Sequence, residues 1–241
     1  MNRKLLHAAV CAALVTGLSA CGGGSSSDPD PGSGSGPPPQ TGRMALIISD
    51  ASSDDWATVG VRILGITLTP QGGGGPVTVY TAPATPPMVN LEQLDQIGEV
   101  LGNVPVPVGT YTGATVTIGA NPGDVQLVVA AEPEAGFAGT AGATIPSADM
   151  QIVGAQGTSE NMTVPVNLTF DSPLVVTAGG SNALDLEFDL SHPAFIVAHD
   201  PPGATATQWA VDFVGPLRRH RIADIAGLVL REMYGDVTAV A

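Results

Sequence analysis

Two segments of the sequence alternate strictly between apolar and polar residues, and this alternation limits the fold more than any other feature. One segment is residues 162–170 and the other is residues 184–190. A period of two is typical of a β-strand with one buried face. In the second segment the polar positions are the acids Asp185, Glu187 and Asp189. We expect these three side chains to lie on a solvent-exposed sheet face.

Shorter apolar segments, separated by glycine and proline, extend this pattern along the chain. They are residues 44–48, 59–68, 77–80, 111–118, 125–130, 174–177, 194–198 and 208–214. In residues 59–68 the apolar parity shifts by one, which predicts a β-bulge near Leu64-Gly65. Together the segments predict an all-β, mainly antiparallel β-sandwich, prealbumin-like or immunoglobulin-like. One short helix is expected over residues 91–101, with Asn90 as its N-cap.

The N-terminus has the organisation of an export signal. A short basic start precedes residues 5–20, an apolar segment too short to span a bilayer comfortably. The segment Leu18-Ser19-Ala20-Cys21 resembles a bacterial lipobox, which implies that Cys21 is the first mature residue and carries lipid. The alternative is an ordinary export signal with a cysteine at its cleavage site. Gly22, rather than Asp, follows the cysteine. In the Gram-negative pattern that the lipobox resemblance implies, this residue favours the outer membrane.

The tract after Cys21 cannot fold by itself. Residues 22–42 contain only Gly, Ser, Pro, Asp, Gln and Thr, so no apolar surface offsets the entropy of ordering. Its mean reach as a flexible chain is on the order of 25 Å. The expected organisation is a signal peptide over 1–20, an anchor and tether over 21–42, a β-sandwich over 43–215 and a tail over 216–241. The tail indicates the start of a truncated second β domain, and the alternative is a last strand, residues 235–240, that pairs back.

Charge and cysteine content exclude several classes of protein. Loss of Arg3 and Lys4 with the signal peptide changes the net charge from −14 to −16. Because binding to nucleic acid depends on cationic contacts to phosphate, we expect no nucleic-acid partner. The two cysteines are Cys11, in the signal peptide, and Cys21. The body therefore has no thiol for a disulfide, a thiolate metal site or a cysteine nucleophile.

The order of several motifs resembles a known family. The motifs are Ser49-Asp50-Ala51 before an acidic loop and Trp56, the strand VGVRILGITLTP, Val89-Asn90-Leu91, Pro107-Val108-Gly109-Thr110-Tyr111, and the closing segment FDSPLVVTAGGSNALDLEFDLSHP. This order is similar to that of the bacterial lipoprotein domain catalogued as domain of unknown function 4382, over residues 44–200. The resemblance implies a compact β fold on an exported lipoprotein. The family has no established activity, so no catalytic residue carries over.

An acidic loop provides a candidate calcium site. Asp50, Asp54 and Asp55 lie within six residues, and calcium prefers six to eight oxygen ligands of this kind. Their spacing is not that of an EF-hand loop, and a solvated loop or an Asx-turn is the alternative interpretation.

Two other groups of residues are candidates for binding. Trp56 and Trp209 are candidates for a face that stacks on sugars, against the alternative of core packing. A possible zinc set consists of His192, His199, Asp200 and His220, against the alternative of structural turn histidines.

The sequence therefore predicts a lipid-anchored module of the cell envelope with a binding, adhesion or structural role. Its expected partners are the membrane, through the lipid, and a protein or glycan. No motif for an enzyme nucleophile, a P-loop or a dinucleotide site occurs in it. The alternatives are a calcium-dependent carbohydrate-binding module and a cation-dependent envelope hydrolase. The hydrolase requires the acidic loop to meet His192 or His199 in one cleft.

Overall fold

The regular secondary structure of the described residues is almost entirely β-strand, so the all-β prediction is confirmed. In this computed structural model the described residues are 38–51, 53–94, 97–190, 195–215, 217–220 and 229–232. The strands all belong to the unit Pro39–Ala241. No helix among these residues is long and apolar enough to cross a membrane.

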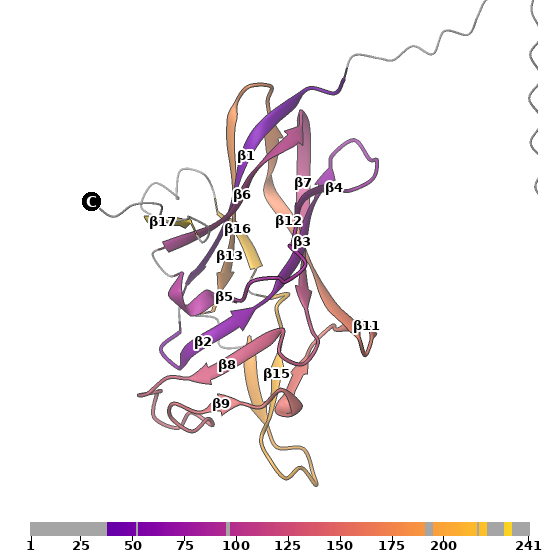
Figure 1. Cartoon of the computed structure of the whole chain (residues 1–241). Helices are drawn as coiled ribbons and strands as arrows, with labels where there is room; N and C mark the ends of the chain where they lie inside the picture. Colours follow the sequence, from indigo (N-terminus) through magenta and orange to yellow (C-terminus); the bar gives the residue numbers. More distant parts are fainter. Residues whose placement is uncertain are drawn as a thin grey trace, which may run out of the picture. The chain divides into compact units, whose positions relative to one another are not determined.

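The first sheet has five strands and carries most of the features discussed below. Its order is β16 (Leu217–His220), β13 (Ser181–Asp189), β1 (Thr41–Ala51), β6 (Ile97–Pro107) and β17 (Val229–Glu232). The strands β1 and β6 run antiparallel side by side (Figure 1). In contrast, β1 pairs with β13 in parallel, over nine residues from Arg43 to Ala51.

The second sheet has five antiparallel strands. Its order is β11 (Gln156–Thr158), β12 (Asn161–Val176), β7 (Gly109–Gly119), β3 (Ile63–Pro70) and β4 (Val77–Thr81). The segments predicted at 162–170 and 174–177 are two parts of the single strand β12, which lies beside β7 (Figure 1).

The two remaining sheets are smaller. The third contains β5 (Val89–Asn90), β2 (Trp56–Val61), β8 (Val125–Val129) and β9 (Thr144–Ile145). The fourth contains β10 (Met150–Ile152), β15 (Gln208–Val211) and β14 (Ile196–His199). Short 3-10 helices precede two strands, at Leu91–Gln93 and Ser147–Asp149.

The β-sandwich prediction is wrong. Four small sheets, arranged as the blades of a four-bladed β-propeller, replace the two facing sheets of a sandwich. Each sheet collects strands that lie far apart in the sequence, and buried residues of all four sheets form one hydrophobic core. Such long-range pairing leaves no mark on local periodicity, because a strand has the same period of two in either architecture.

The parity shift in residues 59–68 has two causes. A bulge lies between Ile63 and Gly65, where β3 pairs with β7, so the predicted irregularity is confirmed. The chain also changes sheet at Arg62, which separates β2 from β3. The backbone N–H of Arg62 donates to the carbonyl of Asp124 (3.0 Å), and its guanidinium pairs with the Asp124 carboxylate (3.5 Å). These contacts fix the corner between the third and second sheets.

The helix predicted over residues 91–101 is wrong. Only Leu91–Gln93 form a helical turn, and the chain continues as β6 from Ile97. Asn90 makes no capping hydrogen bond; its side-chain oxygen accepts from the N–H of Val59 on β2 (3.1 Å). Pairing of β6 with β1 over eight residue pairs outweighs the weak local preference for a helix.

The tail contributes two strands to the first sheet. Arg219 of β16 pairs with Leu186 of β13, while β17 runs parallel to β6. The predicted last strand, residues 235–240, lies outside the described residues. The proposed start of a second domain stays a prediction.

Gly113 of β7 lies where β12 leaves no room for a side chain. A Cβ at this position would lie 2.5 Å from the carbonyl oxygen of Leu168, a backbone atom held in the sheet. We expect Gly113→Ala to lower the free energy of unfolding by about 1–3 kcal/mol, because the strands must separate. Urea unfolding measures this loss. Gly72→Ala is the matched control, since nothing lies within 4 Å of its Cβ, and equal stability of the two variants would contradict the proposed crowding.

Candidate functional site

The acids of β13 are buried, and the prediction that they lie on an exposed face is wrong. Asp185 is 0% exposed, Glu187 9% and Asp189 7%. Their strand lies between β1 and β16 in the first sheet, not at its edge. A carboxylate is stable in such a place when charged or hydrogen-bonding partners replace its water.

Neighbouring strands supply those partners. The Ser49 hydroxyl of β1 donates to Oδ1 of Asp185 (2.8 Å), and Arg218 of β16 forms an ion pair with Asp189. Asp50, at the end of β1, accepts from the backbone N–H of Leu190 (3.2 Å). The alternation in β13 therefore predicts its apolar face correctly, while its acidic face is also buried and receives contacts from Ser49 of β1 and Arg218 of β16.

Ser49 allows a direct test of this burial. Ser49→Ala removes a hydrogen bond to a buried carboxylate, so we expect the free energy of unfolding to fall by about 1.5–3 kcal/mol. Chemical denaturation measures the loss. Ser172→Ala is the control, because this exposed hydroxyl makes no hydrogen bond among the described residues, and we expect a change within about 0.5 kcal/mol. A Ser49→Ala variant as stable as the control would indicate that Asp185 is hydrated.

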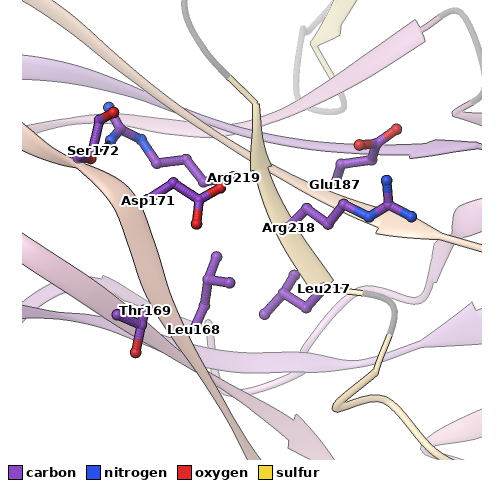
Figure 2. A pocket seen from close by; sticks show the side chains of 8 residues that line it. All are labelled: Leu168, Thr169, Asp171, Ser172, Glu187, Leu217, Arg218 and Arg219. Carbon is purple, nitrogen blue, oxygen red and sulfur yellow. Dashed lines mark hydrogen bonds between the residues drawn. The ribbon is translucent and has the colours of Figure 1, made fainter.

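Two arginines of β16 point to opposite sides of their strand. Arg218 lies opposite Glu187 in the antiparallel register, and its side chain is 57% exposed. Arg219 donates from Nη1 to the Ser172 carbonyl of β12 (2.5 Å), and its guanidinium lies 4.8 Å from the centre of the Phe170 ring. Figure 2 shows Arg218 beside Glu187 and Arg219 beside Ser172. Arg219 thus connects the edge of the first sheet to the second sheet.

A wide bulge in β12 brings that sheet toward β16. Between Thr169 and Leu174, four residues of β12 oppose the single residue Thr112 of β7. Pro173 has no N–H to donate to the ladder, which favours an interruption here. Bulges of this kind change the direction of side chains. The exposed residues Asp171 and Ser172 consequently lie on the side of β12 that meets β16.

The bulge and β16 enclose a groove that we call the seam groove. It has a volume of about 340 Å³ and is drawn in Figure 2. The lining residues are Leu168, Thr169, Asp171, Ser172, Glu187, Leu217, Arg218 and Arg219. Four of the eight are charged, two of each sign, and the buried Leu217 and half-buried Leu168 form an apolar floor. This groove is our candidate functional site.

A second pocket is larger and has a different character. Its volume is about 430 Å³, and it is lined by Ala120, Asn121, Pro122, Gly123, Val125, Ser147, Met150, Gln151, Ile152, Ala155 and Met162. None of these side chains is charged. Asn121 already donates to Asp124 (3.0 Å) and accepts from the N–H of Met162 (3.1 Å). The pocket therefore offers few groups for specific recognition.

The candidate calcium ligands lie in different surroundings. Asp50 is buried at the end of β1, Asp54 is exposed in the following turn, and Asp55 accepts from the backbone N–H of Glu134 (2.9 Å). Among the described residues, no three His, Cys, Asp or Glu side chains form a group able to hold a metal ion. Calcium binding stays a prediction.

Trp56 belongs to a cluster of aromatic rings. Its ring centre lies 5.3 Å from those of both Phe137 and Trp209, with interplanar angles of 87° and 77°. Trp56 is 8% exposed and Trp209 is also buried, so these two rings pack in the core. The structure brings the two tryptophans together, as sugar stacking requires, but it covers them.

Within the described residues, the candidate histidines do not form a cluster that could bind zinc. His199 ends β14 and is half-buried, while His192 and the side chain of His220 lie outside what the structure describes. His199 and Asp50 belong to different sheets. Neither of the two pockets described above is lined by His199 or by an acid of the Asp50–Asp55 loop.

The sequence of this chain matches a known protein family. Residues 41–198 match the family described as domain of unknown function DUF4382, and the chain belongs to that family. The match includes β1, β12 and β13 but ends before β16, so it contains one wall of the groove and excludes the two arginines. No curated protein and no solved structure matches the chain.

Proposed function

We propose that the protein is a lipid-anchored module of the cell envelope, in the outer membrane, with a non-enzymatic binding role. The observation that carries this proposal is the position of Cys21. It follows a short apolar segment and precedes a tract that cannot fold. The first strand, β1, begins at Thr41, at the end of that tract. The order of signal, lipid, tether and folded body is the order that a tethered module requires.

The seam groove supports a binding role for the body. Asp189 is held by Arg218, and the Asp185 carboxylate is held by the Ser49 hydroxyl. Neither carboxyl group is among the lining residues of the groove, and both contacts hold neighbouring strands of the first sheet together. A groove with fixed charges on rigid strands is suited to recognition.

Metabolic labelling tests the anchor. Cells that produce the protein are grown with an alkyne-bearing fatty acid, and the purified chain is coupled to a fluorophore. We expect the wild-type protein and Cys11→Ser to be labelled, because Cys11 lies in the segment to be removed. We expect Cys21→Ser to carry no label. Labelling of Cys21→Ser, or none of the wild type, would refute the proposed anchor.

A further inference from the structure

A loop between β8 and β9 contacts both tryptophans of the chain. The loop, residues 131–141, carries Phe137 near its middle (Figure 1). The centre of the Phe137 ring lies 5.3 Å from that of Trp56 and 5.7 Å from that of Trp209. Because Trp56 begins β2 in the third sheet and Trp209 lies on β15 in the fourth, one ring of the loop packs against side chains of two sheets.

Few other contacts attach this loop to the fold. None of residues 131–141 is buried, and Phe137 is their only large apolar side chain. Among the described residues, a single hydrogen bond joins the loop to the facing turn, in which the backbone N–H of Glu134 donates to Oδ1 of Asp55 (2.9 Å). Segments with exposed backbone and few apolar contacts open at low cost, because opening restores their conformational entropy.

The charges at this contact oppose closure of the loop. Glu132 and Glu134 lie on the loop, and Asp54 and Asp55 lie on the turn to which it is bonded. Neither the loop nor the turn contains a lysine or an arginine. Like charges repel one another at such short range. The ring of Phe137 and the Asp55 carboxylate therefore hold the loop closed against both entropy and charge.

We propose that residues 131–141 form a lid that opens while the four sheets stay folded, and that the lid controls access to Trp56 and Trp209. The base of the lid stays closed, since the N–H of Gly142 donates to the carbonyl of Ala130 (3.0 Å). Opening uncovers two tryptophan rings whose centres are 5.3 Å apart, and exposed rings of this kind stack on flat or ring-shaped ligands. The inference goes beyond the proposed binding role and depends neither on the lipid anchor nor on the seam groove.

Asp55→Ala tests the lid on the full-length protein in detergent. The variant removes the carboxylate that holds the N–H of Glu134 but keeps Phe137, so rings covered by rigid packing would stay covered. A tryptophan-selective sulfonium reagent labels accessible indole rings, and mass spectrometry of the peptides that contain Trp56 and Trp209 measures the rate. Loss of a hydrogen bond to a charged group is expected to make labelling about tenfold faster than in the wild type. Equal rates would overturn the proposal.

Asp54→Ala is the matched control. It removes an equal charge from the same turn, but the Asp54 side chain is exposed and makes no hydrogen bond within the described part of the chain. Because this change only reduces the repulsion between turn and loop, we expect labelling at the wild-type rate or slower. Equally fast labelling of Asp54→Ala and Asp55→Ala would show that the bond to Glu134 does not hold the lid, which would contradict the proposal.

The dependence of labelling on urea separates opening of the lid from unfolding of the whole body. A lid exposes little surface, so the labelling rate is expected to change less than about twofold at low urea concentrations. Global unfolding exposes the entire core, so labelling through it would rise steeply with urea. A steep rise from the first addition of urea, in the wild type or in Asp55→Ala, would overturn the proposal.

Discussion

Replacement of Cys21 by serine is expected to move the protein from the membrane fraction to the soluble fraction of the cell. Each buried lipid methylene contributes about 0.8 kcal/mol to membrane binding, so the acyl chains provide nearly all of the attachment. The acidic body adds nothing, because a net charge of −16 after loss of the signal peptide opposes contact with anionic lipid. We expect the membrane-bound share to fall at least about tenfold.

Fractionation followed by immunoblotting measures this change. Cys11→Ser is the matched control, since it alters the other cysteine of the chain within the signal peptide. We expect this control to remain in the membrane fraction. If Cys21→Ser also stayed there, attachment would depend on another part of the protein.

Replacement of Phe188 by alanine is expected to cost about 3–5 kcal/mol of unfolding free energy. Phe188 is fully buried on β13, where it lies opposite Leu217, part of the floor of the seam groove. Removal of its ring leaves a cavity where β13 meets β16. Domains are usually stable by about 5–15 kcal/mol, so this loss is a large share of the total.

Guanidinium denaturation compares the Phe188→Ala variant with Val175→Ala. Val175 lies on β12 and is 57% exposed, so we expect its truncation to change stability by no more than about 0.5 kcal/mol. A loss below about 1 kcal/mol for Phe188→Ala would contradict the tight packing of β13 in the core.

The periodicity of the sequence predicted the positions of most strands, but it did not predict which strands pair with one another. The alternation in residues 184–190 predicts β13 and its apolar face, but the partners of the acids come from Ser49, in a distant strand, and Arg218. The apolar spacing of Leu91, Leu94 and Ile97 fits a helix, yet β6 forms because it pairs with β1. The period of apolar residues along a strand indicates which of its faces is apolar. The order of strands in a sheet depends instead on contacts between residues that are far apart in the sequence.

The candidate site was visible in the sequence only in part. Arg218 and Arg219 stand out as the basic cluster of an acidic chain, yet nothing local indicates that they meet β12. The segment Asp171-Ser172-Pro173 contains residues typical of turns, and this signal could have predicted the bulge. Its separation from β16 by more than 40 residues hides the groove from any local analysis.

The mature N-terminus tests the account most directly, because both the anchor and the tether depend on it. Intact-mass and N-terminal peptide analysis of the protein purified from membranes identifies its first residue and any modification. We predict a chain that starts at Cys21 and carries lipid on the cysteine sulfur and amine. A chain that starts at any other residue, or an unmodified Cys21, would contradict the account.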